Sequence, residues 1–347
     1  MCEILISIFI SIFISISISI LLIYFSSRQQ AIIMYTRYMN RELVKALIKD
    51  YDLPIAFYDD PYWTHFKTLL EPFYKIEDKI NLMNENVGKY SLEDFVAQYR
   101  KVSELIIKEV TANPAYQEFN TCNLEKQFTL PPKGFASAQK LYSSDQVDGE
   151  IICSIDLIKA NFAVLKAFNP LMVSQAETYS DFFDKYSDNS YLKESKKVRQ
   201  VIFGNLNPKR QQTLQRYYMS WVKEYLAQAG LEEGQVLLAS SDELVFKVKD
   251  MEETKKLVAQ VFTQPQIAIL NKDYRATFFK LKKVHPEYDY FVKEYISPEG
   301  KIEFKNIPAQ YLAQVVRYYL QQDAHVFDRK FIVDGQVATF DKELFSK

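Results

Sequence analysis

Hydrophobic residues in the first third of the chain follow the period of an amphipathic helix. Between residues 39 and 113 they recur at intervals of three and four, which indicates helices with one buried face. Residues 129–134 then contain two consecutive prolines, which interrupt both helices and central strands. We therefore predict a mostly helical N-terminal domain over residues 34–149.

Beyond residue 150, short apolar runs typical of strands are interleaved with helical stripes. Strands are predicted over residues 150–157, 237–246 (a hairpin), 276–284, 288–296 and 301–307, with a short β-segment ending at residue 340. Helices are predicted over residues 158–168, 195–205, 208–229, 250–262 and 308–321. This order predicts an α+β fold with an antiparallel sheet, in which a core over residues 150–262 is completed by C-terminal strands and a helix over residues 263–347.

The longest of these predicted helices has well-defined ends. Asn207 is expected to be its N-cap, Pro208 occupies its first position, and Gly230 ends it. Its hydrophobic residues repeat at helical spacing, so one stripe of this helix is expected to be buried.

Residues 1–33 form a separate, low-complexity hydrophobic segment. Residues 4–25 carry no charge and are long enough to cross a bilayer. The segment is a poor signal peptide, because Glu3 replaces the usual basic start and no small-residue cleavage site follows. Two interpretations stay open, a membrane anchor or a translation start at Met34. Both place the main body inside the cell, in the cytoplasm or nucleus, with a membrane tether in the first case.

Composition excludes several enzyme classes. The eight glycines do not form a dinucleotide fingerprint, a P-loop or a nucleophile elbow. The three cysteines and three histidines are scattered without the spacing of zinc ligands, and such sparse cysteines are typical of a reducing compartment. The net charge of −1 gives no global attraction to nucleic acid, so such binding would need a local basic patch.

Residues 193–216 provide that patch, with seven basic residues and one acidic residue. Within it Lys196, Arg199 and Phe203 are spaced at i, i+3 and i+7, which is expected to place them on one helix face. Two cations beside an aromatic ring suit a nucleoside triphosphate, because cations bind phosphates and a ring stacks on a base.

Two acidic positions could complete such a site. Asp242 and Glu243 lie at the turn of the predicted hairpin, and Asp156 ends the strand over residues 150–157. Aspartates fixed at the ends of adjacent strands are suited to hold a pair of divalent cations for phosphoryl chemistry. We therefore expect Asp156 and Asp242 to lie close together.

The order of these motifs resembles the palm-domain polymerases, and most nearly the family A DNA polymerases. The Asp156 strand is similar to motif A, Arg199 before Phe203-Gly204 to motif B, and Ser241-Asp242-Glu243 to motif C. The resemblance covers about residues 150–250 and implies an antiparallel palm-like domain.

The family resemblance implies roles for individual residues. Two Mg²⁺ ions would be held by Asp156, Asp242 and the Leu157 carbonyl, and Glu243 would help to place the primer end. The triphosphate and base would be bound by residues of the basic segment, namely Arg199, Lys196 or Lys197, and Phe203, while Asn161 stands where the family excludes ribose. The implied reaction is template-directed attack of a 3′-hydroxyl on a nucleoside triphosphate during DNA replication, with a primer–template as the nucleic-acid partner.

The sequence also departs from the family pattern. Ser195 stands in place of an arginine, Asn207-Pro208 in place of Tyr-Gly, and Ser241 in place of a histidine. The interval between the two aspartates is short, which leaves room only for small helical fingers. Two alternatives remain: a metal-dependent nuclease, and a non-catalytic nucleic-acid-binding or membrane-tethered scaffold protein.

Overall fold

The computed structural model describes residues 41–87, 92–132, 138–142 and 147–345. The hydrophobic segment over residues 1–33 and the start of the predicted N-terminal domain lie outside these ranges. Within them, every helix is too short or too polar to span a bilayer.

The first part of the described chain is helical, as predicted. Its helices are α2 (Arg41–Tyr51), α3 (Tyr62–Tyr74), α4 (Ile76–Val87), α5 (Leu92–Ala112), α6 (Pro114–Thr121) and α7 (Leu124–Gln127). The start of α6 shows how the sequence sets these boundaries. Pro114 occupies its first turn, and the Asn113 side chain accepts a hydrogen bond from the Ala115 amide, which satisfies a donor that the helix leaves unpaired.

The described strands up to residue 305 form one antiparallel sheet of seven strands in the order β1-β3-β4-β2-β5-β6-β7. Its strands are β1 (Ala138–Gln139), β2 (Ile151–Leu157), β3 (Val236–Ala239), β4 (Glu243–Lys247), β5 (Tyr274–Lys283), β6 (Phe291–Ser297) and β7 (Ile302–Lys305). The α+β class and the antiparallel sheet are therefore confirmed. The strand that carries Asp156 is β2, which lies between β4 and β5.

The helices between β2 and β5 are α8 (Ala160–Phe168), α9 (Tyr179–Asp184), α10 (Ser190–Glu194), α11 (Lys196–Gly204), α12 (Pro208–Gln228) and α13 (Met251–Val261). Among them, α12 packs against β4 and α13 against β5, while α8 packs against α12. Short 3₁₀ turns connect the main elements, η2 (Pro170–Val173), η3 (Glu233–Gln235), η4 (Ala268–Leu270), η5 (Ala309–Tyr311) and η6 (Val326–Arg329). The start of α12 differs from the prediction. Asn207 has a left-handed backbone and makes no side-chain cap, and its side-chain amide donates to Asn120 of α6.

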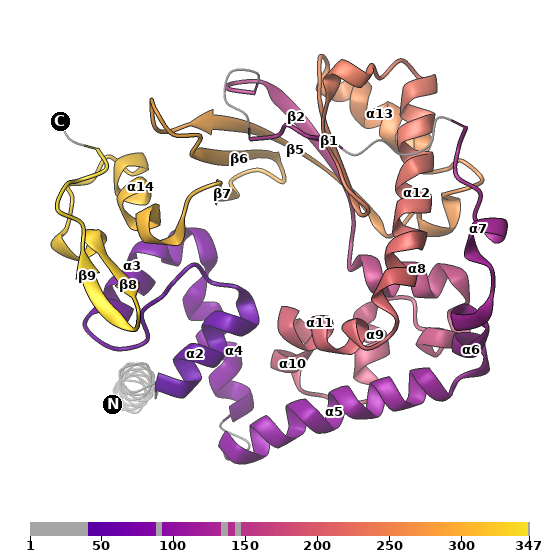
Figure 1. Cartoon of the computed structure of the whole chain (residues 1–347), viewed down its shortest axis with the longest axis horizontal. Coiled ribbons are helices and arrows are strands. Elements are labelled where there is room, and N and C mark those ends of the chain that lie inside the picture. The colour runs from indigo at the N-terminus through magenta and orange to yellow at the C-terminus, as the bar shows by residue number, and fades with distance from the viewer. Residues whose placement is uncertain (1–40, 88–91, 133–137, 143–146, 346–347) are drawn as a thin grey trace, which may run out of the picture.

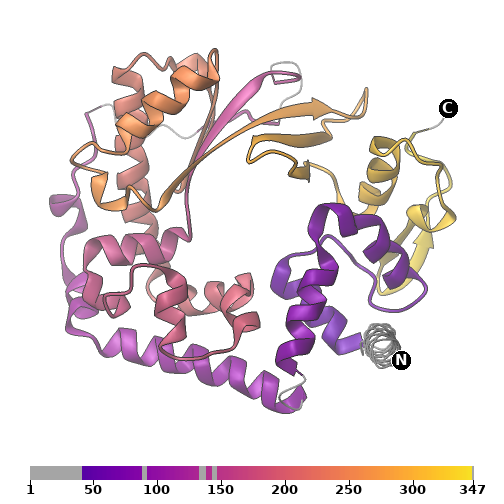
Figure 2. The ribbon, with the colours of Figure 1, turned by 180° about the vertical axis from the view of Figure 1, so that it is seen from behind.

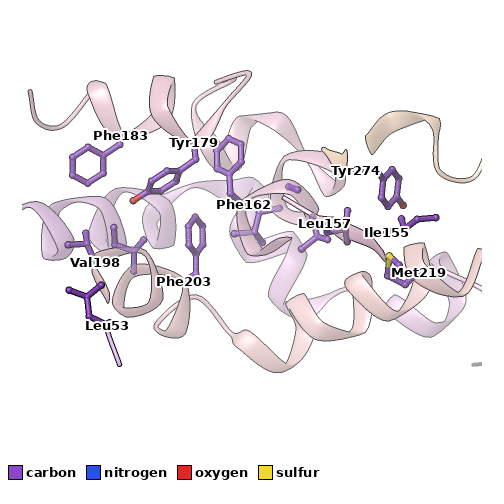
Figure 3. Close-up of a cluster of buried hydrophobic side chains, with 14 of the residues drawn as sticks. Leu53, Ile155, Leu157, Phe162, Tyr179, Phe183, Val198, Phe203, Met219 and Tyr274 are labelled. Atoms are coloured by element: carbon purple, nitrogen blue, oxygen red, sulfur yellow. The ribbon is translucent and has the colours of Figure 1, made fainter. Parts of the chain in front are cut away.

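The alternation of side chains along β2 defines two different faces. Cys153, Ile155 and Leu157 are buried in the main hydrophobic core with the helices, and Figure 3 shows how this core continues from β2 through Phe162 and Tyr179 to α11. Ile152 belongs to a second, smaller core, to which Leu141 and Val147 also belong. Ser154 and Asp156 share the face of Ile152, because residues two apart on a strand point the same way. We call it the open face.

The C-terminal part returns to the N-terminal helices. It comprises α14 (Leu312–Tyr319), β8 (Lys330–Val333) and β9 (Gln336–Thr339), the last two forming a separate hairpin. Several ring contacts join this region and β7 to α3, among them Tyr62 to Phe327 at 5.0 Å and Phe73 to Phe304 at 4.9 Å between centroids. In both views the indigo and yellow ends of the described chain lie side by side, and the elements follow one another around a ring (Figures 1 and 2).

Candidate functional site at the end of the central strands

Sheet pairing brings the predicted acidic residues to one place. Asp156 on β2 is directly opposite Glu243 on β4 in the antiparallel register. Asp242 immediately precedes Glu243, and its carbonyl accepts a hydrogen bond from the Leu157 amide at 3.0 Å. The two segments, eighty-six positions apart in sequence, are therefore neighbours, as the sequence analysis expected. Directly opposed residues point to the same side of a sheet, so Asp156 and Glu243 share the open face.

Each of the three acidic side chains has its own polar partner. Asp156 Oδ2 lies 2.6 Å from the Arg275 guanidinium, and Glu243 Oε1 accepts a hydrogen bond from Ser154 Oγ at 2.6 Å. Asp242 Oδ1 accepts one from Ser240 Oγ at 3.1 Å. These contacts direct the three carboxylates towards separate partners, so the acids are adjacent without converging on a single point.

The donor set is compatible with Mg²⁺ in its chemistry. Mg²⁺ prefers carboxylate and carbonyl oxygens, and these acids provide them beside each other. Even so, in the part of the chain that the structure describes, no three His, Cys, Asp or Glu side chains are grouped closely enough to hold a metal ion. Metal binding by Asp156 would require its carboxylate to exchange Arg275 for the cation. Leu157 presents a buried side chain to the helices, so it could contribute only its backbone carbonyl.

A second group of charged residues lies on the same face of β6 and β7. Lys293 is opposite Glu303 in the register and only 8% exposed, and its ammonium lies 3.9 Å from the ring centroid of Phe279. Burial lowers the pKa of Lys293 to about 8, although the charge of Glu303 opposes this. Burial favours the protonated form of Glu303, but hydrogen bonds and charge from Lys301 and Lys305 outweigh it and lower the pKa of Glu303 to about 2.

Tyr142 connects this group with the acids. Its ring lies 6.0 Å from that of Phe291. Burial raises the pKa of Tyr142 to about 12, and the charges of Glu243 and Glu303 contribute to the same shift. The charges of Glu243 on β4 and Glu303 on β7 therefore both act on the Tyr142 hydroxyl. Sequence reasoning missed Arg275 and Tyr142, although the alternation of polar residues along β5 was a visible signal.

Arg199 and Phe203 both approach the Tyr179 ring, so they share a face of α11, but Phe203 cannot provide the predicted stacking surface. Phe203 is completely buried, with its ring 6.1 Å from that of Tyr179, so it is not exposed to stack on a base. Lys196 is exposed and pairs with Asp52 of the N-terminal region at 2.8 Å. Phe203 is buried because α11 packs against α2, α5 and α10. These contacts cover more of the helix surface than its hydrophobic stripe predicted.

The remaining predicted nucleotide-binding residues have identifiable surroundings. The Arg199 guanidinium lies 5.7 Å from the centroid of the Tyr179 ring. Lys197 is half-buried and opposes the rise that burial causes in the pKa of Asp50. Asn161 on α8 accepts a hydrogen bond from Gln215 of α12 at 2.6 Å. None of these contacts involves the acidic residues.

A different part of the basic segment borders the hairpin turn. A pocket of ≈ 690 Å³ is formed by α12, the segment around α7 and the β3–β4 turn, and its lining includes Lys209, Arg216, Tyr217, Ser240 and Ser241. Because Ser241 directly precedes Asp242, this pocket, with two cations and an aromatic ring in its lining, borders the turn that carries Asp242. Arg210, which lies between these two cations in the sequence, has a structural role instead.

Arg210 connects two helices. It donates to the carbonyls of Phe119 and Cys122, each at 2.6 Å, and so joins α12 to α6.

Two of the three histidines are neighbours in the structure. The rings of His65 and His325 are stacked at 4.5 Å, and His65 Nε2 lies 2.7 Å from Asp328 Oδ1. Arg317 Nε also contacts the Asp328 carboxylate, at 3.1 Å. This cluster joins α3 to η6, far along the chain from the acidic residues of β2 and β4.

No protein-family model, curated protein or solved structure matches this chain.

Proposed function

We propose that the protein is a template-directed nucleotidyltransferase that uses two Mg²⁺ ions at Asp156 and Asp242, on a palm-like sheet. The observation that supports this most directly is the juxtaposition of the end of β2 with the β3–β4 turn. Helices back the opposite face of the same sheet, so the acids stand on a rigid platform. Rigid support of this kind is what a catalytic carboxylate pair requires.

The chain's own residues would each perform a separate task. The carboxylates of Asp156 and Asp242 would hold the cations, and the hydrogen bond from Ser240 to Asp242 orients one of them in advance. Glu243, held by Ser154, would position the primer end. Bound Mg²⁺ would lower the pKa of the attacking 3′-hydroxyl and stabilise the leaving pyrophosphate.

The pocket on α12 supports the nucleic-acid side of this proposal. Lys209 and Arg216 would contact phosphates, and Tyr217 offers an aromatic surface to a base, which is the usual combination in single-strand binding. Within the basic segment over residues 193–216, contact with nucleic acid is therefore assigned mainly to the residues on α12. Lys196, Lys197, Arg199 and Asn161 stay predicted contacts of the nucleotide, and Phe203 is assigned to the core instead.

Replacing the two aspartates tests the reaction itself. We expect Asp156→Asn and Asp242→Asn each to reduce primer extension by about 10²-fold or more, because the cations they hold act on charge that develops in the transition state. Binding of the primer–template should change little. The assay is extension of a labelled primer–template with Mg²⁺ and deoxynucleoside triphosphates, and Glu252→Gln, an exposed acid on α13, is the matched control.

The same assay separates the alternatives. Progressive shortening of the labelled strand would identify a nuclease. Salt-dependent binding without extension or degradation, unchanged in both aspartate variants, would identify a non-catalytic binding protein. Full extension activity in either aspartate variant would contradict the proposed metal site.

A further inference from the structure

The cation closest to the candidate metal site belongs to the protein. Arg275 on β5 is directly opposite Asp156 in the register, and its guanidinium lies 2.6 Å from Asp156 Oδ2. The Arg275 side chain is 57% exposed and that of Asp156 29% exposed. A positive charge thus contacts one oxygen of the carboxylate that would hold a metal ion.

A purely structural role explains this pair poorly. Ion pairs that are this accessible to water contribute little to folding, and the β2–β5 register is already set by backbone pairing along the whole of β2. A divalent cation carries twice the charge of a guanidinium at the same carboxylate. It can therefore displace Arg275 without loss of buried contacts.

The displaced guanidinium would stay on the open face. The side chain is rooted on β5, and its charge already reaches Tyr295 on β6, where it opposes the rise in the pKa of that phenol caused by burial and by Glu303. A free guanidinium offers five donors in a planar fork that matches phosphate oxygens. The ligand class that fits both the released arginine and the metal-bearing acids is a phosphate ester or polyphosphate.

We propose that Arg275 is a substrate-binding residue whose availability is controlled by the metal ion. Before the cation binds, Arg275 neutralises Asp156; once a cation occupies the carboxylate, Arg275 is released and binds a phosphate of the nucleoside triphosphate. Cation and triphosphate are then coupled through one side chain, so each increases the affinity for the other. This inference rests on the proposed metal site and adds an order of events to it.

The test measures binding without turnover. Mn²⁺ affinity is followed by electron paramagnetic resonance, and triphosphate affinity is measured with and without Ca²⁺, in the wild type, Arg275→Gln and Arg275→Lys. For Arg275→Gln we expect about 3- to 10-fold tighter Mn²⁺ binding, because the competing charge is gone, and about 10-fold weaker triphosphate binding in the presence of Ca²⁺. Arg275→Lys should keep most of the competition with Mn²⁺ and lose part of the triphosphate affinity.

The control is Lys282→Gln, an exposed cation on the same strand that points to the opposite face, and it should change neither affinity. Thermal unfolding of each variant checks that the fold is kept. If the wild type binds Mn²⁺ in an Asp156-dependent way but Arg275→Gln changes neither affinity, the coupling is wrong and the metal site stands. If Mn²⁺ does not bind the wild type, the metal site and the coupling are both wrong.

Discussion

Lys293 is a buried lysine on the open face of the sheet. Its ammonium lies between the rings of Phe279 and Tyr295, 3.9 and 4.7 Å from their centroids. Such contacts favour the charged form, but burial outweighs them and lowers its pKa to about 8. The folded protein therefore holds this proton less tightly than the unfolded chain does.

This difference predicts a pH-dependent gain on replacing Lys293 by methionine. Below pH 8 the wild type must keep a buried charge, a cost that fades as the pH rises from 8 towards the unfolded value of 10.5. Lys293→Met should therefore raise the free energy of unfolding at pH 7, and this advantage should shrink by about 2 kcal/mol at pH 10. Urea denaturation of both proteins at the two pH values measures it, and a difference independent of pH would contradict the shift.

Helix α12 connects the sheet to the rest of the molecule. Its C-terminal end leads through a short turn into β3 and so fixes the hairpin that carries Asp242. Its hydrophobic stripe is buried as predicted, with Leu214, Tyr218 and Val222 in the core. Its other side presents Lys209 and Arg216 to the pocket beside Ser241. One element thereby supports both the acidic turn and the cationic pocket.

This division predicts which basic residues bind nucleic acid. The double variant Lys209→Gln/Arg216→Gln should weaken binding of a single strand and reduce the slope of log affinity against log salt by about 1.4, because two phosphate contacts are lost. Lys255→Gln is the matched control on α13, since Lys255 pairs with Glu252. Fluorescence anisotropy over a salt series gives the slopes, and an equal effect of the control would place the interface elsewhere.

At the level of the whole molecule, the ring is closed by contacts between the N-terminal helices and the C-terminal part (Figure 1). Asp328 is the central acceptor at this junction and is only 1% exposed. It accepts hydrogen bonds from Arg317, from His65 and from the His325 backbone amide. The two ends of the described chain are therefore joined by one buried carboxylate.

Loss of that charge should loosen the junction. Asp328→Asn should lower the free energy of unfolding by about 2 kcal/mol, because charge-assisted hydrogen bonds are weakened and one donor loses its acceptor. Asp323→Asn, an exposed acid in the same segment, should change it by less than about 0.5 kcal/mol. Denaturant unfolding measures both, and similar losses in the two variants would show that the cluster does not stabilise the junction.

The sequence by itself determined the parts of the fold that depend on local periodicity. The strand that ends near Asp156, the hairpin at Asp242, and the helices now seen as α11 to α13 are all close to their predicted ranges. The reason is that period-2 and period-3.6 patterns, prolines and capping residues act within a few positions.

Only the tertiary structure decided which side chains meet. Arg275 reaches Asp156 across 119 positions and His65 reaches Asp328 across 263, and neither pairing leaves a local pattern. The burial of Phe203 was decided in the same way, by packing of α11 against distant helices. Contacts of this kind depend on strand order and register, where a shift of one residue would turn Asp156 to the helical face. The partners of the acidic site therefore follow from the assembled sheet and could not be read from the chain.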